Sequence, residues 1–219
     1  MNPLSQFGIV PVDFATVSDA LGHYRSPRDK VSALERDGQL IRLKKGAFVV
    51  SPQIAGAPLS PELIANHLCG PSYVSLETAL AFYGLIPESV HATRSMTLKR
   101  ARSFKTPLGL FDYTRVPLSY FPIGVRRHTT GDVGKANGNV AAGVSFLIAS
   151  PEKALCDMVF ATSNLRLQSA GAARTYFEEN LRVDFDVLDK IDVNVVRQCA
   201  ATGAKKHLLL HVAEFLENL

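Results

Sequence analysis

Two histidines near the end of the chain have a spacing that could support metal binding. His207 and His211 stand four residues apart on a predicted helix, and Glu214 follows within one turn, so all three could reach one ion. No HExxH motif accompanies them, and no cysteine or further carboxylate nearby in the sequence completes a ligand set. The alternative is a helix whose polar histidines flank apolar leucines. We therefore predict no metal site.

Two other stretches hold residues of the types used in catalysis or phosphate binding. Glu152 and Lys153 are neighbours that point apart on a helix, whereas Asp157 lies one turn from Lys153, so a capping acid and an ion pair account for all three. Residues 131–139 contain glycines and a lysine but lack the spacing of a phosphate-binding loop and a preceding strand, which favours a connecting loop. The sequence shows no Ser/His/Asp or Cys/His arrangement typical of nucleophilic catalysis. We predict no catalytic residue, no cofactor and no enzymatic activity.

Positive charge is concentrated in two segments of the chain. The 219 residues have a net charge of +4, but residues 23–50 hold seven Lys or Arg against three Asp or Glu. Residues 91–135 hold nine against two, and residues 152–219 hold eight against ten. Such an asymmetry suggests two parts with different functions and different partners. The alternative is ordinary solvated surface.

The composition is that of a globular protein. Apolar residues make up 47% of the chain, and no apolar run is long enough to cross a bilayer. The N-terminus has neither a basic segment nor the apolar stretch of a signal peptide. The cysteines, Cys69, Cys156 and Cys199, are scattered, and no two have metal or redox spacing. We expect a cytoplasmic protein with buried, unpaired cysteines.

The first fifty residues predict two short helices and a hairpin. Thr16, with Asp19 three residues later, can cap the first helix. Ser26 caps the second, Pro27 occupies its first position, and Gly38 ends it. After this glycine the apolar period changes to two, which indicates a strand, a Lys-Lys-Gly turn and a returning strand.

Two helices followed by a basic hairpin is the order of a winged helix-turn-helix, whose second helix enters the major groove while the hairpin follows the phosphates. Ser32 and Arg36 would face base edges, and Lys44 and Lys45 would contact phosphates. A supporting helix normally comes first, whereas residues 1–13 look extended. Similar units also serve as protein-docking modules. The predicted DNA-binding residues are Arg25, Arg28, Lys30, Ser32, Arg36, Arg42, Lys44 and Lys45.

A second basic patch is predicted in the middle of the chain. Its members are Lys99, Arg100, Arg102, Lys105, Arg126 and Arg127. Aromatic residues alternate with these cations and could stack on single-stranded nucleic acid, although at strand spacing they could instead fill the core of a sheet. These aromatics are Phe104, Phe111, Tyr113, Tyr120 and Phe121.

The fold class that these patterns predict is α+β, in two domains. A Pro-, Ser-, Ala- and Gly-rich stretch at residues 51–62 marks the boundary. We predict a winged helix-turn-helix domain over residues 1–55 and, over residues 56–219, a mixed α+β domain with a helical C-terminal tail. Strands are expected at 90–100, 109–117, 119–127 and 144–150, and helices at 62–68, 75–84, 151–162, 170–181, 185–191, 193–203 and 205–219.

Three stretches of the chain resemble, in order, the segments of one protein family. "ALERDGQLIRLKKGAFVV" resembles the wing region of AbiEi-type antitoxins, in which a leucine-rich helix precedes Gly-x-Leu, a basic pair, a glycine and an aromatic strand. "YVSLETALAFYGL" resembles that family's small-residue helix ending in an aromatic or His and Gly-Leu. "FLIASPEKALCDMV" resembles its third segment, an apolar strand followed by a Glu-Lys helix ending in Asp. Together they cover residues 26–160.

This resemblance implies an antitoxin and transcriptional repressor of a type IV toxin–antitoxin system, with a role in phage defence by abortive infection. The winged domain would bind inverted repeats in double-stranded DNA of its own promoter. The larger domain would counter a nucleotidyltransferase-like toxin, in the usual description without a stable complex. No membrane partner is expected. The alternatives are a nuclease-like enzyme targeted by the winged domain, which needs a metal-binding carboxylate pair, and a protein-interaction scaffold.

Overall fold

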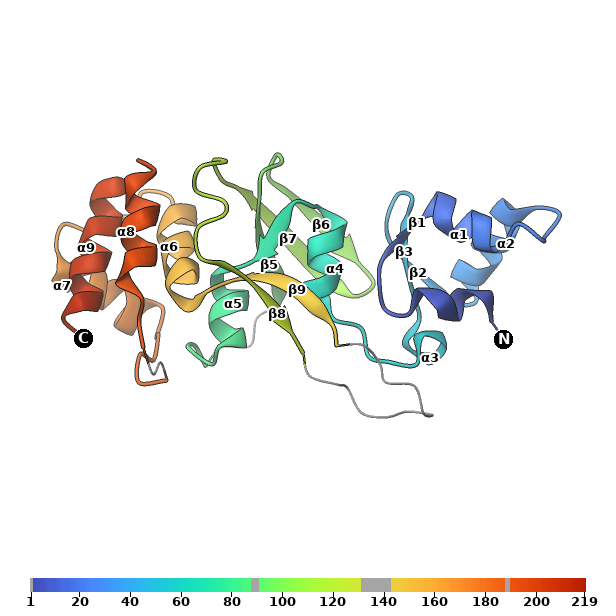
Figure 1. Ribbon diagram of the computed structural model, residues 1–219, viewed down its shortest axis with the longest axis horizontal. Helices are drawn as coiled ribbons and strands as arrows, with labels where there is room; N and C mark the ends of the chain where they lie inside the picture. The colour runs from blue at the N-terminus through green and yellow to red at the C-terminus, as the bar shows by residue number, and fades with distance from the viewer. Residues whose placement is uncertain (1, 88–90, 131–142, 188–189) are drawn as a thin grey trace.

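The computed structural model describes residues 2–87, 91–130, 143–187 and 190–219. The molecule is elongated, with the two ends of the chain at opposite ends of its long axis (Figure 1). A unit of short helices and strands, residues 2–55, lies at one end and is called the small module below. The other described residues form the large module, in which a sheet lies in the middle and a helical tail at the far end (Figure 1). The predicted α+β class is confirmed.

The small module builds a three-stranded sheet beside its helices. Its middle strand is β3, which is antiparallel to β1 on one side and to β2 on the other. In chain order the elements are the 3-10 helix η1 (Pro3–Phe7), β1 (Val12–Asp13), α1 (Phe14–Ala20), α2 (Pro27–Arg36), β2 (Leu40–Lys44), β3 (Ala47–Val50) and α3 (Pro52–Ala55).

The predicted helix–helix–hairpin order is present, but two local predictions were wrong. The cap of α1 is Asp13 and not Thr16, because the carboxylate of Asp13 accepts a hydrogen bond from the backbone N–H of Thr16 at 2.8 Å. The N-terminal stretch is not extended: it forms η1, and Leu4 from this helix is fully buried in the core of the small module. Gly38 follows α2 with a φ of +70°, where glycine is favoured.

The β2–β3 hairpin is buried on both of its faces. Leu40, Phe48 and Val50 pack into the small module's own core with the helices. Leu43 and Val49 belong instead to the core of the large module. This two-sided burial explains why β3 is a continuous apolar run, since a strand with one wet face alternates between apolar and polar residues.

The large module is organised around a six-stranded mixed sheet with the order β6-β7-β5-β4-β9-β8. Only the pairs β4–β9 and β5–β7 within this sheet are parallel. The sheet and its first helices comprise α4 (Pro61–Leu68), β4 (Ser72–Val74), α5 (Leu76–Phe82), β5 (Ala92–Thr97), β6 (Arg102–Thr106), β7 (Gly109–Arg115), β8 (Val125–Thr129) and β9 (Ser145–Ala149). The tail comprises α6 (Pro151–Ala161), α7 (Ala170–Arg174), the π-helix η2 (Thr175–Asn180), α8 (Val193–Ala201) and α9 (Lys206–Glu217).

Helices cover both faces of this sheet. The hydroxyl of Tyr113 on β7 donates a hydrogen bond to the carbonyl of Ala65 on α4 at 2.7 Å. Arg94 on β5 pairs with Glu77 on α5 at 2.6 Å. Tyr113 is in register with Ser95, the residue next to Arg94, so Tyr113 and Arg94 point to opposite faces. Helix α4 therefore packs on one face and α5 on the other.

Several predicted elements of the large module were wrong or missed. The edge strand β6 and the short strand β4 were not predicted as strands of their own. Residues 119–124, predicted as strand, form turns, and residues 185–187, predicted as helix, lie in a bend and turn. Gly124 ends the first of these turns so close to α6 that a Cβ atom there would lie 2.8 Å from Cβ of Lys153.

The core of the large module contains an ion pair that solvent does not reach. Lys153 and Asp157 on α6 both have side chains that are 0% exposed, and the Nζ and Oδ1 atoms are 3.4 Å apart. Lys153 also donates to the carbonyl of Tyr120 at 3.0 Å, and Ser75 donates to Oδ2 of Asp157 at 2.6 Å. The predicted pairing of Lys153 with Asp157 is confirmed, but its burial was not predicted. Because Ser75 starts α5, the pair joins α5, α6 and the 120–124 turn.

Replacing Lys153 by Met leaves the buried carboxylate of Asp157 without its cation, and we expect the free energy of unfolding to fall by about 3–5 kcal/mol. Burial raises the pKa of Asp157 above its ordinary value of 3.8. A carboxyl whose pKa is higher in the folded state than in the unfolded state favours folding most when it is protonated, at a pH below its unfolded-state pKa of 3.8. The stability of the Lys153→Met variant should therefore decrease as the pH rises above 3.8. Urea denaturation at several pH values measures this.

The control for this prediction is the double variant Lys153→Met/Asp157→Leu, which removes both charges. It should recover much of the lost stability, because no uncompensated charge is left in the core. A double variant as unstable as Lys153→Met, with no pH dependence in either, would show that packing and not the charge causes the loss.

Candidate nucleic-acid interface

Helix α2 presents a row of polar side chains to solvent. Arg28, Ser32 and Arg36 are spaced four residues apart and are all exposed, so they lie along one face of the helix. The opposite face holds Val31 and Leu34, which are buried in the small module's core. Among the residues that the structure describes, neither Arg28 nor Arg36 forms an ion pair with an acid. The two arginines therefore keep their full charge toward solvent.

The start of α2 has an exposed cation, Arg25, and an acidic residue, Asp29, that forms a hydrogen bond with the neighbouring Ser26. Arg25 precedes the helix and is exposed. Asp29, in the first turn, accepts a hydrogen bond from the hydroxyl of Ser26 at 2.7 Å. Ser32 donates its own hydroxyl hydrogen to the carbonyl of Arg28 at 3.2 Å. The oxygen of Ser32 thus remains an acceptor, whereas Arg36 supplies donors.

Arg42 was predicted as a DNA contact, but its guanidinium is already paired. It donates two hydrogen bonds to the carboxylate of Glu35, each 2.6 Å long. The hydrogen bonds from Arg42 hold the pKa of Glu35 below its ordinary value, so this carboxylate stays charged. Arg42 also lies over the ring of Phe48, 5.1 Å from its centroid. The pair cancels most of the field that Arg42 would present to a phosphate.

Lys44 does not lie free at the tip of the hairpin, and this part of the sequence prediction was wrong. Its Nζ atom donates to the carbonyl of Leu68, the last residue of α4, at 2.5 Å. The same nitrogen lies 5.6 Å from the ring centroid of Phe104 on β6. Lys44 is therefore a half-buried contact between the two modules. Lys45, the next residue, is exposed beside the turn glycine and remains available.

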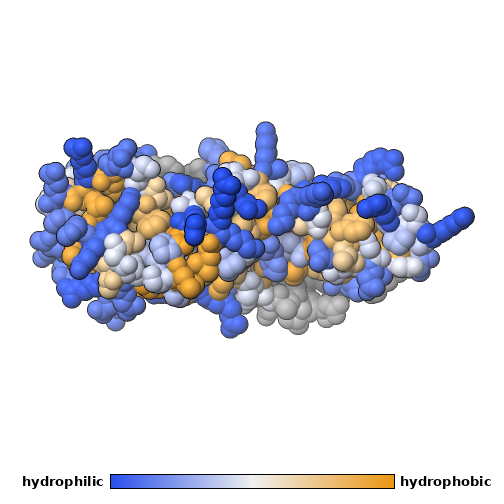
Figure 2. All heavy atoms as spheres, turned by 90° about the horizontal axis from the view of Figure 1, so that it is seen from above, coloured by the Kyte–Doolittle hydropathy of each residue, from blue (hydrophilic) through white to orange (hydrophobic). Residues whose placement is uncertain are grey.

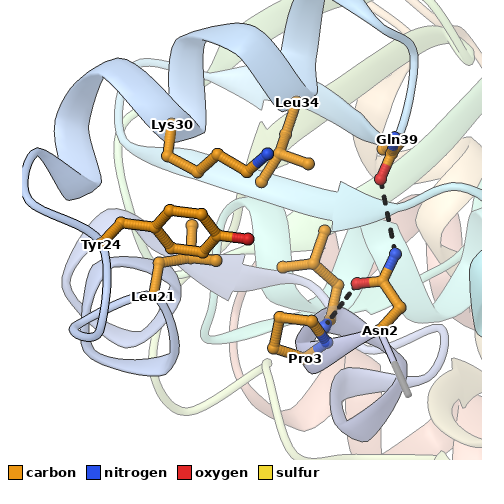
Figure 3. A pocket seen from close by; sticks show the side chains of 8 residues that line it. Asn2, Pro3, Leu21, Tyr24, Lys30, Leu34 and Gln39 are labelled. Atoms are coloured by element: carbon orange, nitrogen blue, oxygen red, sulfur yellow. Dashed lines mark hydrogen bonds between the residues drawn. The ribbon is translucent and has the colours of Figure 1, made fainter.

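Lys30 is turned away from the exposed row of α2. Its Nζ atom lies 5.0 Å from the ring centroid of Tyr24, and the side chain is half-buried. Figure 3 shows both residues at the edge of a hollow of about 250 Å³ between η1 and α2. Leu21 and Leu34 form part of its apolar wall. The structure thus separates Lys30 from the other predicted DNA contacts on this helix.

The second basic patch was predicted as one surface, and the sheet divides it into two. Strands β6 and β8 are the opposite edges of the six-stranded sheet. Lys99 and Arg100 lie in the turn before β6, and Arg102 and Lys105 lie on that strand. Arg126 and Arg127 lie on β8. All six side chains are exposed, but they cannot form a single patch because four strands lie between the two edges.

The aromatic residues of the middle segment serve the core. Phe111, Tyr113 and Tyr120 are buried, and Phe104 and Phe121 pack against the same core. The prediction that these rings fill the sheet's core is confirmed, and buried rings cannot stack on nucleic-acid bases. Burial also raises the pKa of Tyr113 above its ordinary value, since no water solvates its phenolate.

The remaining chemical candidates show no assembled site within the described parts of the chain. His211 pairs with Glu214 at 3.5 Å, whereas His207 is exposed. Within residues 2–87, 91–130, 143–187 and 190–219, no three or more His, Cys, Asp or Glu side chains are grouped as metal ligands. The predicted loop at residues 131–139 lies outside the described residues. The three cysteines are buried and unpaired, as predicted.

Among the residues that the structure describes, no helix has both the length and the apolar content needed to cross a bilayer.

Neither the models of known protein families nor the curated proteins contain one that matches this chain.

Substitution of the two neighbouring lysines separates the module contact from the exposed cation. Lys44→Met keeps the apolar stem but removes the donor to Leu68, and we expect the free energy of unfolding to fall by about 1 kcal/mol. Lys45→Met removes an exposed charge that has no partner among the described residues, and the free energy of unfolding should stay within about 0.5 kcal/mol of that of the parent protein. Urea denaturation measures both. Equal effects of the two substitutions would contradict the assignment of Lys44 to the module contact.

Proposed function

We propose that this chain is a DNA-binding transcriptional repressor whose small module acts as a winged helix-turn-helix. The observation that carries the proposal is the exposed row of Arg28, Ser32 and Arg36 on α2, the helix directly before the hairpin. A winged module inserts this helix into the major groove. Arg36 would read guanine through two parallel hydrogen bonds, and the free arginines would approach phosphates without first breaking an ion pair.

Two further features of the small module support this proposal. Along the chain, β1 comes before the helix pair and the hairpin after it, and these strands form one sheet in the order β1-β3-β2. Helix η1 precedes both helices and contributes Leu4 to their core, which supports the proposal because a helix-turn-helix normally has a supporting helix ahead of these two. In this arrangement Lys45 is the phosphate contact of the hairpin, because Lys44 is held by the large module.

The antitoxin part of the proposal rests on the family resemblance of residues 26–160. We propose that the large module counters a nucleotidyltransferase-like toxin encoded beside this gene. The second and third resembling stretches meet in the core, where Ser75 donates to Asp157. This hydrogen bond joins the two stretches in the core, so in this proposal they stabilise the large module.

DNA binding is tested with a duplex that carries the sequence upstream of the gene for this chain. Arg36→Ala should weaken binding by about 1–3 kcal/mol and reduce the preference for this duplex over a scrambled one. Lys45→Ala should weaken binding to both duplexes equally, because a phosphate contact carries no sequence information. Fluorescence anisotropy at fixed salt measures the affinities.

The matched control for the DNA-binding test is Arg166→Ala, which removes an exposed arginine of the large module. It should leave both affinities unchanged. An affinity of Arg36→Ala and Lys45→Ala equal to that of the parent protein would contradict the proposal.

The antitoxin role is tested by co-expression with the product of the neighbouring gene. That product alone should arrest growth, and co-expression of the full chain should restore it. The double variant Arg28→Ala/Arg36→Ala should restore growth equally well, because these residues belong to the small module and the opposing surface to the large one. Continued arrest in the presence of the parent protein would contradict the antitoxin role, and rescue by the parent alone would contradict the division between modules.

A further inference from the structure

The hairpin of the small module and the edge strand β6 of the large module meet around one aromatic ring. Lys44 on β2 and Arg102 on β6 both have their cationic groups within 6 Å of the ring centroid of Phe104, at 5.6 and 5.9 Å. Lys45, the exposed cation of the hairpin, is the next residue along the chain. The basic end of β6 therefore continues the surface that the hairpin begins.

Strand β6 and the residues on either side of it carry positive charges and no acidic residue. Residues 98–108 contain four Lys or Arg and no Asp or Glu. Lys99, Arg100 and Arg102 are exposed, and within the described residues none of them pairs with an acid. Arg126 on the far edge differs, since it lies 3.9 Å from the buried carboxylate of Glu152. The edge of the sheet at β6, beside the small module, thus has more cations without an acidic partner among the described residues than the edge at β8.

Seen from above, strongly hydrophilic side chains lie over the small module and over the middle of the molecule, and others lie over the helical tail (Figure 2). Duplex DNA presents one negative charge for about each 1.7 Å of its axis. A duplex bound along the hairpin would therefore also present phosphates to cations that lie beyond the hairpin.

We propose that the large module binds the phosphates of the same duplex that the small module reads, through Lys99, Arg100 and Arg102. This inference rests on the proposed DNA-binding function and extends it to a second surface. The three cations supply affinity and no sequence discrimination, since they lie on an edge strand and its preceding turn and have no helix to enter a groove. Both modules therefore contact the same duplex.

Two exposed cations of the same module lie outside this surface and serve as controls. Side chains alternate along a strand, so Lys105 points to the face of β6 opposite to that of Arg102 and Phe104. Arg127 lies on β8, five strand spacings or about 24 Å from β6. Neither forms an ion pair within the described residues, so their removal leaves no buried acid without a partner.

The test compares two charge-matched double variants of the full chain, Lys99→Ala/Arg100→Ala and Lys105→Ala/Arg127→Ala. The affinity of each for a mixed-sequence DNA duplex is measured by fluorescence anisotropy over a series of salt concentrations. Loss of two phosphate contacts should make the slope of log K against log salt shallower by about 1.8. We expect this change for Lys99→Ala/Arg100→Ala and the parent slope for the control variant. Thermal unfolding of both variants verifies that the fold is intact.

The possible outcomes separate this inference from the function on which it rests. An unchanged slope for Lys99→Ala/Arg100→Ala, with binding still weakened by Arg36→Ala, would overturn the second surface and keep the DNA-binding function. Equal changes for both double variants would also overturn it, since they would report only the overall charge. A parent protein that does not bind any duplex would overturn the DNA-binding function and this inference together.

Discussion

The arrangement of the molecule depends on a hairpin with two apolar faces. An antiparallel sheet can leave one face to water, but Leu43 and Val49 make the outer face of β2–β3 apolar, and the large module covers it. Burial of two aliphatic side chains contributes about 3–6 kcal/mol, which is comparable to the net stability of a whole domain. The hydrogen bond from Lys44 to Leu68 lies at the end of the same contact. The two modules are therefore joined by a shared core and not by a flexible linker alone.

This packing also determines which cations remain available to a partner. Lys44 and Lys45 are neighbours of the same type, yet one is held by a helix carbonyl and a ring while the other faces solvent. Arg42 and Arg36 differ in the same way, because only Arg42 has Glu35 within reach. The positive surface consequently consists of fewer residues than the basic sequence suggests, and it extends from the small module to the edge of the large one.

The parts of the fold that were predictable from the sequence are those with strong local signals. Pro27 and Gly38 delimit α2, and Ser150 caps α6 through the backbone N–H of Lys153. The exposed row on α2 follows from the helical period alone. Strand β6 was missed because an edge strand needs few apolar residues, and the burial of Lys44 depends on residues far away in the sequence. Thr16 was predicted as the cap of α1, but β1 ends at Asp13, so the helix begins at Phe14 and Asp13 is the cap.

The parallel pairing of β4 with β9 has a consequence for biosynthesis. Val74 is in register with Ile148, so the central sheet cannot close until most of the chain has left the ribosome. The short-range contacts among η1, α1, α2 and the hairpin can form much earlier, since nearby segments meet fastest. During translation Leu43 and Val49 on the outer face of the hairpin are therefore exposed to water until the large module packs against them.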